Sequence, residues 1–312
     1  MPRKKINPSR LSKAWKTLYK LENYPLDEKV EYSKSLIIEA LDNSKNPTIS
    51  WSGGKDSTVV LHLIKEIYPS IPIIFVDMDT LFPETKKYVY DLASSWKLNL
   101  YIEKPIENTF ESITEKYGYP IFSKNIASNV ERAIRTGNIR KQLSKFELLL
   151  VKHKAKISTK CSQYLLEKPC KNKEKELTCD LKFIGLRAFE SRARVRLWAD
   201  YGDYYSVKEY YGKKKPILKC NPIAAWTEAD IWNYFKRYNI PICDIYNKGY
   251  QRNGCWSCAM AIRNGQLKRL KNYNPNLYNH LIYNTNMGKE ILRLRDILKN
   301  ENGFKNYINL PK

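Results

Sequence analysis

The residues best suited to chemistry are numbers 50 to 57, which read Ser-Trp-Ser-Gly-Gly-Lys-Asp-Ser. They lie between a β-like run at 47–51 and an apolar, helix-like run at 58–68, so the sequence predicts a tight loop between a strand and a helix. Gly53 and Gly54 lack Cβ atoms, which allows backbone N–H groups to close around the oxygens of a phosphate. The following helix points its positive N-terminus at the same anion. The backbone of this segment therefore predicts a phosphate-binding loop.

Side chains of the same loop fit that interpretation. Lys55 supplies a mobile positive charge, and Asp56 can hold a Mg²⁺ ion that neutralises phosphates. Ser52 and Ser57 supply hydroxyl groups. A Walker A loop is excluded, because the spacing Gly-x-x-x-x-Gly-Lys-Ser/Thr is absent. The simpler alternative is a Gly-Gly turn that joins a strand to a helix and binds nothing.

A second polar segment ends the apolar run at 71–77, which reads as a strand buried on both faces. Either Asp77 or Asp79 can accept a hydrogen bond from a ribose or an adenine, and Met78 and Phe82 offer apolar contact to the base. Ligands of open α/β sheets bind beyond the carboxyl ends of the strands, which is where this segment lies. The alternative is an ordinary strand end followed by a helix that a proline opens.

A third segment, Gly-Leu-Arg-Ala-Phe-Glu-Ser at 185–191, follows another short strand signal. Arg187 leaves the strand end and can place its guanidinium fork on phosphate or sulfate oxygens. Glu190 begins a helix and favours its N-terminus. Further arginines follow at 192, 194 and 196, where ligand contact and a solvated helix face fit the spacing equally well.

The seven cysteines favour free thiols and metal ligands over disulfides in a chain of this kind. Cys255 and Cys258 form a Cys-x-x-Cys pair preceded by a glycine, and two thiolates at that spacing can bind one metal centre. The spacing does not separate iron from zinc, and loose structural thiols are a third alternative. Cys220 precedes an apolar stretch and is expected to be a buried small residue.

The elements that must position these residues alternate along the chain. After helical signals in the first 45 residues, strand signals at 47–51, 71–77, 98–103 and 183–186 are separated by helix signals. This order predicts an α/β fold, a parallel twisted sheet with helices on both faces. We expect an N-terminal helical lead-in at 1–45, a nucleotide-binding α/β domain at 46–240, and a cysteine-bearing segment with a basic helical tail at 241–312.

Bulk composition narrows the class of protein. The 312 residues, 43% of them hydrophobic, can bury a large core. No apolar run is long enough to cross a bilayer and no signal-like segment opens the chain, so we expect a cytoplasmic protein without a membrane partner. The excess of 55 Lys and Arg over 32 Asp and Glu attracts polyanions such as nucleic acid, although a lysine-rich solvated surface gives the same net charge of +23. The composition indicates no oligomeric state.

Taken in order over residues 47–260, these segments resemble the phosphoadenosine-phosphosulfate (PAPS) reductase family of the PP-loop ATP-pyrophosphatase superfamily, the adenine nucleotide α-hydrolases. Residues 50–57 resemble the PP-loop. Residues 77–85 resemble the family's Asp-Thr-x-x-x-Phe-Pro-Glu-Thr segment, with Met78 where threonine is usual. Residues 185–194 resemble its Gly-x-Arg-x-x-Glu-Ser-x-x-Arg signature. The resemblance implies the family's fold and a bound adenine nucleotide, either ATP with Mg²⁺ or a sulfonucleotide.

The resemblance also extends to the cysteines. Ser-Thr-Lys-Cys at 158–161 is similar to the family segment that supplies further cluster cysteines, although Lys160 stands where the first of two adjacent cysteines is common. Cys243 lies twelve residues before Cys255 in the same irregular stretch and is our choice for a fourth ligand. Its rivals are Cys170, Cys179 and Cys220. The pattern is similar to that of DNA-phosphorothioation sulfurtransferases, and it implies a [4Fe–4S] cluster, with zinc as the alternative, on Cys161, Cys243, Cys255 and Cys258.

Three functions fit the sequence. The first is an ATP-dependent sulfurtransferase that adenylylates an acceptor, such as nucleic acid, releases pyrophosphate and receives sulfur from a donor protein. The second is a sulfonucleotide reductase, whose usual Glu-Cys-Gly-x-His tail has no counterpart after Cys258. The third is a non-catalytic nucleotide-binding partner in a complex, against which the intact loop argues. The residues expected to act in catalysis are Lys55, Asp56 and Arg187, and those expected to bind the nucleotide are Ser52, Gly53, Gly54, Ser57, Asp77, Asp79 and Glu190.

Overall fold

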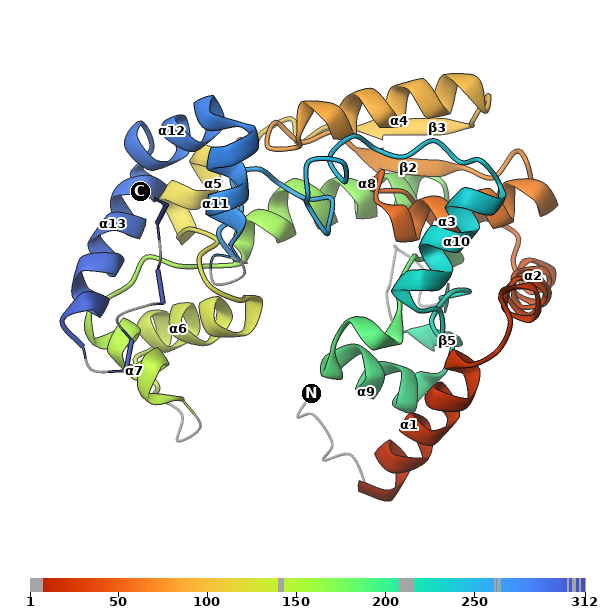
Figure 1. Ribbon diagram of the computed structural model, residues 1–312, viewed down its shortest axis with the longest axis horizontal. Coiled ribbons are helices and arrows are strands. Elements are labelled where there is room, and N and C mark those ends of the chain that lie inside the picture. Colours follow the sequence, from red (N-terminus) through yellow and green to blue (C-terminus); the bar gives the residue numbers. More distant parts are fainter. Residues whose placement is uncertain are drawn as a thin grey trace. The chain divides into compact units, whose positions relative to one another are not determined.

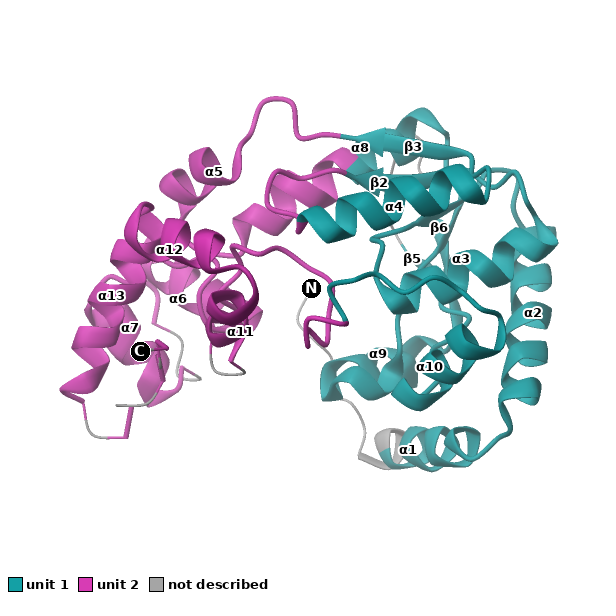
Figure 2. Cartoon of the chain, turned by 45° about the horizontal axis from the view of Figure 1, so that its top comes forward, with its two compact units in different colours: residues 1–76, 83–103, 170–246 teal, residues 77–82, 104–169, 247–312 magenta. Residues whose placement is uncertain are grey.

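The computed structural model describes residues 8–139, 143–207, 216–260, 262, 265–301, 303–304, 307–308 and 310–311. The chain forms two compact units, shown in teal and magenta in Figure 2. Unit 1 comprises residues 1–76, 83–103 and 170–246, and unit 2 comprises residues 77–82, 104–169 and 247–312. Each unit is therefore assembled from three separate stretches of the chain.

A six-stranded sheet forms the centre of unit 1, and Figure 1 labels its strands β2, β3 and β5. The strand order is β3-β2-β1-β4-β6-β5. The first five strands in this order run parallel, and the edge strand β5 runs antiparallel to β6. The α/β fold class that the sequence predicts is thus confirmed. The strands are β1 (Pro47–Ser50), β2 (Ile73–Val76), β3 (Leu100–Glu103), β4 (Leu181–Phe183), β5 (Tyr204–Val207) and β6 (Ile217–Cys220).

The inner strands are apolar because they are covered on both sides. Ile49 on β1 pairs with Ile73 on β2 and with Phe183 on β4, and all three side chains are fully buried. Strands β3 and β5, at the two edges of the sheet, are only partly buried. β-Branched and aromatic residues that lose both faces to packing are typical of parallel sheets. The helices associated with this unit are α1 (Pro8–Glu22), α2 (Leu26–Asp42), α3 (Lys55–Ile67), α4 (Pro83–Ser95), α8 (Lys168–Glu176), α9 (Arg192–Tyr201) and α10 (Glu228–Arg237).

Two helix pairs hold the functional segments of unit 1 in place. Helix α3 packs against α2 and α10, so the helix that follows the phosphate-binding loop is fixed from two sides. Helix α10 begins with a capping box in which the Thr227 hydroxyl accepts from the Asp230 N–H and the Asp230 carboxylate accepts from the Thr227 N–H. Asp230 also forms a buried 2.6 Å ion pair with Lys29 of α2. The start of α10 is therefore held in place.

Unit 2 is built from helices and irregular chain. Its helices include the π-helical turn η1 (Ser162–Glu167). Helix α11 (Gln266–Tyr273) packs on α12 (Pro275–Tyr283), which packs on α13 (Asn286–Lys299). Glu290 of α13 accepts a hydrogen bond from the Lys156 N–H at 2.9 Å and pairs with Arg293. These contacts tie the end of the chain to its middle. The helices of this unit are α5 (Phe110–Tyr117), α6 (Lys124–Thr136), α7 (Lys145–Lys152), α11 (Gln266–Tyr273), α12 (Pro275–Tyr283) and α13 (Asn286–Lys299).

The observed elements differ from the expected ones mainly at their ends. The helix after the phosphate-binding loop begins at Lys55 rather than at residue 58, because Gly54 takes the extended N-cap conformation and the chain turns helical directly after it. Strand β4 covers Leu181–Phe183, so it begins two residues earlier than the strand expected at 183–186 and ends where that strand was expected to begin. Within the described part of the chain, none of the helices has the length and apolar character needed to span a bilayer.

Candidate nucleotide-binding site

The phosphate-binding loop forms in unit 1 as a tight turn between β1 and α3. Gly53 has a φ of 71°, a left-handed conformation that glycine adopts without steric cost. The Ser52 hydroxyl accepts a hydrogen bond from the Gly54 N–H at 3.3 Å and lies 3.1 Å from the Ser57 hydroxyl. The Ser57 hydroxyl also donates to the Gly54 carbonyl at 3.0 Å. The two serines therefore brace the loop from within, and their hydroxyl groups stand beside the N-terminus of α3.

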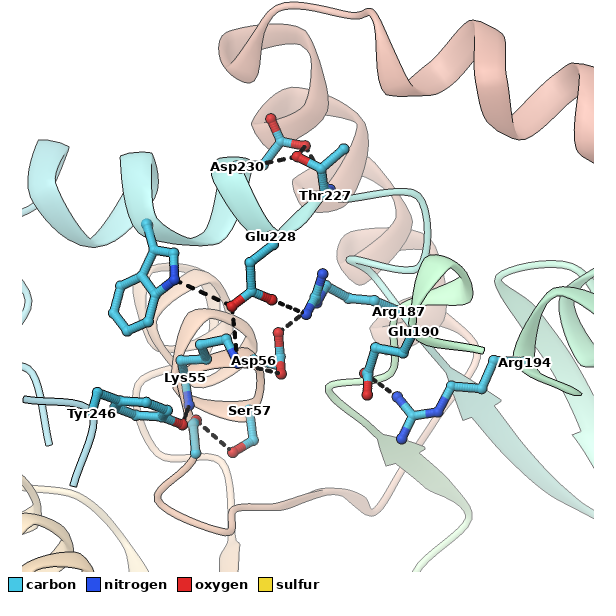
Figure 3. Close-up of polar contacts among 12 residues, drawn as sticks. Lys55, Asp56, Ser57, Arg187, Glu190, Arg194, Thr227, Glu228, Asp230 and Tyr246 are labelled. Carbon is cyan, nitrogen blue, oxygen red and sulfur yellow. Dashed lines mark hydrogen bonds and ion pairs between the residues drawn. The ribbon is translucent and has the colours of Figure 1, made fainter. Parts of the chain in front are cut away.

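Lys55 is buried, with a relative exposure of 4%, and neighbouring residues contact both its backbone N–H and its side-chain ammonium group. Its backbone N–H donates to the Tyr246 hydroxyl at 2.8 Å. Its ammonium nitrogen lies 3.2 Å from Glu228 Oε1 and 3.9 Å from Asp56 Oδ2 (Figure 3). The same nitrogen stands 5.4 Å from the centre of the Tyr246 ring and 6.0 Å from that of Trp232, so two aromatic rings add cation–π attraction.

Arg187 leaves β4 and reaches the same two carboxylates. Its Nε donates to Asp56 Oδ1 at 2.6 Å, and its Nη2 donates to Glu228 Oε2 at 2.5 Å (Figure 3). Burial works to lower the pKa of Arg187, but the charges of Asp56 and Glu228 outweigh it and raise the pKa, so the guanidinium stays charged. Two buried cations and two carboxylates thus form one ionic network at the start of α3.

Gly185 explains how Arg187 comes so close to the loop. A Cβ atom on Gly185 would lie 2.6 Å from the Ser57 nitrogen and 2.8 Å from the Asp56 carbonyl carbon, closer than non-bonded atoms approach. The chain after β4 therefore touches the backbone of the first turn of α3, and only glycine allows it. This contact supplies a physical reason for the glycine that opens the 185–191 segment.

The other expected residues of that segment form a local pair. Glu190 accepts a hydrogen bond from Arg194 Nη1 (Figure 3). The Ser191 hydroxyl caps α9 by accepting from the Arg194 N–H. Arg194 is thus engaged with its own helix start. The proposed role of Glu190 in nucleotide binding stays a prediction.

Asp77 and Asp79 belong to unit 2, whereas the phosphate-binding loop belongs to unit 1. Asp79 accepts a 3.4 Å hydrogen bond from the Phe110 N–H at the start of α5. Phe82, expected to contact a base, packs edge-on against the ring of Tyr250 at 4.9 Å. The adenosine-binding role of this segment stays a prediction.

Three of the four expected metal ligands, Cys161, Cys255 and Cys258, belong to unit 2. Burial, with the nearby Cys258 and Cys161 thiols adding to it, raises the pKa of Cys255 to about 12. Burial and Cys258 raise the pKa of Cys161 to about 11. The segment is anchored by a 3.0 Å hydrogen bond from the Trp256 N–H to the Thr80 carbonyl. The three thiols are therefore close enough to affect one another's charge.

Cys243, the expected fourth ligand, lies in unit 1, where its thiol donates to the Glu84 carbonyl at 3.7 Å and is buried. Among the residues that the structure describes, no three His, Cys, Asp or Glu side chains are arranged to hold a metal ion. The iron–sulfur cluster and its four cysteine ligands stay a prediction.

Sequence reasoning missed the part that Glu228, Tyr246 and Trp232 play in this site. Glu228 was recognisable only as a residue in the first turn of a helix opened by a capping box. That helix follows β6, and β6 lies next to β4 in the sheet. An acidic residue after a strand end was therefore the available signal, but the strand order that places it beside Arg187 could not be read from the sequence.

A family model for the phosphoadenosine phosphosulfate reductase domain matches residues 46–261, more than half of the chain. The chain belongs to the phosphoadenosine phosphosulfate reductase family. Members of this family are enzymes, and the family predicted from the sequence is confirmed.

Two reductases are similar to this chain in sequence over about two thirds or more of its length. The phosphoadenosine 5'-phosphosulfate reductases of Xylella fastidiosa and Proteus mirabilis are each 27% identical to this chain. The first alignment covers 66% of this chain and 69% of the relative, and the second covers 73% and 76%. Among solved structures, the PAPS reductase from Candida auris in a phosphate complex aligns with a TM-score of 0.47 and 19% identity, over 81% of this chain and 97% of that one.

Proposed function

We propose that this member of the PAPS reductase family binds an adenine nucleotide at the PP-loop and uses it for sulfur transfer. The observation that carries the proposal is the pair of buried cations, Lys55 and Arg187, at the N-terminus of α3. Two fixed positive charges beside a helix N-terminus attract the phosphates of a nucleotide and stabilise negative charge that develops on a leaving group.

The proposed reaction begins with ATP. An acceptor oxygen attacks the α-phosphorus, the bond from that phosphorus to the bridging oxygen breaks, and pyrophosphate leaves with the electron pair. Lys55 and Arg187 stabilise the charge on the leaving pyrophosphate, and the Ser52 and Ser57 hydroxyl groups orient phosphate oxygens. Asp56 is the carboxylate suited to Mg²⁺, which when bound there would neutralise charge on the phosphates. A sulfur nucleophile from a donor protein then displaces AMP from the adenylylated acceptor.

The state of the thiols favours this reaction over sulfonucleotide reduction. All seven cysteines are free, and burial raises the pKa of every one of them. Reduction requires a thiolate that attacks sulfur and is then resolved by a second thiol, and a thiol of raised pKa is less often present as the thiolate. Sulfonucleotide reductase is the second candidate, because the similar proteins from Xylella fastidiosa and Proteus mirabilis are reductases and Arg187 suits a sulfate.

Nucleic acid is the proposed acceptor, supported by the net charge of +23. Binding to nucleic acid should weaken steeply with salt, because each neutralised phosphate releases a counterion. If binding is absent or insensitive to salt, the acceptor is a small molecule or a protein instead.

A nucleotide panel tests the proposal. Anaerobically prepared protein is incubated with ATP, PAPS or adenylyl sulfate, and the release of pyrophosphate and of sulfite is measured. We expect pyrophosphate from ATP in the wild type and its loss in Lys55→Ala. Lys65→Ala, in the last turn of the same helix, removes an equal charge away from the loop and should retain activity. Sulfite release that depends on an external dithiol would instead establish the reductase.

A further inference from the structure

Glu228 is the most exposed member of the ionic network at the start of α3. Its side chain is 52% exposed, against 21% for Asp56, 6% for Arg187 and 4% for Lys55. One of its carboxylate oxygens lies 3.2 Å from the Lys55 ammonium, and the other accepts the 2.5 Å hydrogen bond from Arg187 (Figure 3). The Trp232 indole also donates to it at 3.2 Å. Both buried cations are therefore engaged by one solvent-exposed anion.

We propose that the Glu228 carboxylate is a built-in competitor for the ligand. It occupies the cations in the nucleotide-free protein, and an incoming phosphate or sulfate displaces it. The inference rests on the proposed function, because it concerns the same site. Glu228 would lower the affinity of this site for phosphate or sulfate, because the incoming anion must displace its carboxylate.

The chemistry of the two anions makes them interchangeable. Glu228 gives one oxygen to Arg187 and the other to Lys55, and a phosphate or sulfate also has separate oxygens that can accept from both cations. Buried cations are strongly destabilised unless anions balance their charge. Asp56 and Glu228 supply that charge together, and Glu228 does so from the first turn of α10, which the Thr227–Asp230 capping box holds in place. A side chain that remains half exposed can turn away toward water when a stronger anion arrives.

The same contacts allow a different role, in which Glu228 stays in place and binds a metal ion with Asp56. The two roles predict opposite effects of removing the charge. Removing a competitor takes away one of the anions that Lys55 and Arg187 engage, so an incoming anion binds more tightly, with or without Mg²⁺. A metal ligand, once removed, weakens binding when Mg²⁺ is present.

Calorimetric titration with inorganic pyrophosphate, with and without Mg²⁺, distinguishes the two roles. Glu228→Gln keeps the shape of the side chain and removes its charge. We expect it to bind pyrophosphate about tenfold to a hundredfold more tightly than the wild type without Mg²⁺, the range given by one charge-assisted hydrogen bond. Unchanged or weaker binding by Glu228→Gln would overturn the inference.

Glu66→Gln is the matched control. It removes one negative charge from α3 itself, but Glu66 pairs with Lys34 and lies about 15 Å along the helix from Asp56. Its affinity for pyrophosphate should stay within about twofold of the wild type. If Glu66→Gln tightens binding as much as Glu228→Gln does, the effect comes from net charge and the inference is wrong.

Stability supplies a second readout. Glu228→Gln should have a lower Tm than the wild type without ligand, and saturating pyrophosphate should raise its Tm by more than it raises that of the wild type. If Glu228→Gln does not fold, Glu228→Asp serves instead, because its shorter side chain weakens the contacts with both cations. It should show a smaller gain in affinity for pyrophosphate, and no gain would count against the inference.

Lys55→Ala separates this inference from the proposed function. If the wild type binds pyrophosphate, Lys55→Ala does not, and Glu228→Gln binds no more tightly than the wild type, only the inference is contradicted. If neither the wild type nor Glu228→Gln binds pyrophosphate, both the inference and the proposed function are contradicted.

Discussion

Gly185→Ala should disturb the site without changing a charged or polar group. The added methyl carbon would lie 2.6 Å from the Ser57 nitrogen, and ordinary contact begins at 3.4 Å, so the backbone must separate by about 0.8 Å. All three nearest atoms are backbone atoms of α3, which cannot turn aside as a side chain would. Overpacking of this kind costs about 1–3 kcal/mol, offset by about 0.4–1 kcal/mol because alanine has less freedom than glycine in the unfolded chain.

The functional effect should exceed the loss of stability. A displacement approaching 1 Å between reacting groups lowers rates by about 100-fold, because Arg187 would no longer meet the phosphates held by the loop. We therefore expect Gly185→Ala to lose about two orders of magnitude in pyrophosphate release from ATP while its Tm falls by several degrees, at about 2–4 °C per kcal/mol.

Two measurements decide this prediction, thermal unfolding and the rate of pyrophosphate release. Gly254→Ala is the control, since a Cβ there would meet no atom within 4 Å, and its Tm should be unchanged or slightly higher. Wild-type Tm and wild-type rates in Gly185→Ala would refute the close approach between the 185–191 segment and α3.

Arg187→Lys should weaken nucleotide binding by about tenfold in a calorimetric titration, because an ammonium cannot donate to two separate anions in the planar geometry of a guanidinium; wild-type affinity would contradict the role of the guanidinium fork. Anaerobically purified protein should contain iron and sulfide, both lost in Cys255→Ser and in Cys258→Ser, and zinc without iron would contradict the iron–sulfur prediction. Burial lowers the pKa of His62, so the folded protein binds the proton less well than the unfolded chain. The stability that neutral His62 contributes above its unfolded pKa of about 6.5 is lost as the pH falls toward the folded value, and the Tm should therefore drop more between pH 7.5 and 5.5 in the wild type than in His62→Gln. Equal drops would show that His62 is not the group responsible.

The sequence predicted the features that depend on local patterns. The loop at 50–57, the apolar run that becomes β2 and the capping box at the start of α10 all reflect neighbouring residues, so their placement follows from propensity and hydrogen bonding close by. Arg187 was expected to contact a ligand, and the structure places its guanidinium against Asp56 in the loop.

Features that depend on distant contacts could not be predicted. Glu228 joins the site because β6 lies beside β4 and α10 packs on α3, neither of which a single sequence specifies. The close approach of Gly185 to Ser57 could not be predicted either, because these residues lie more than a hundred positions apart in the sequence. The division of the chain likewise arises from contacts between separate stretches, which places Cys243 in unit 1 and Cys255 in unit 2.

The central claim is that a nucleotide binds at Lys55 and Arg187 and is cleaved between its α- and β-phosphates. The most direct measurement incubates anaerobically prepared protein with ATP labelled at the α-phosphorus and follows the label over a single turnover. We expect label in AMP or in an adenylylated acceptor, with an equal amount of pyrophosphate, and neither product in Lys55→Ala. Label that stays in ATP, or appears in ADP, in the wild type would contradict this claim.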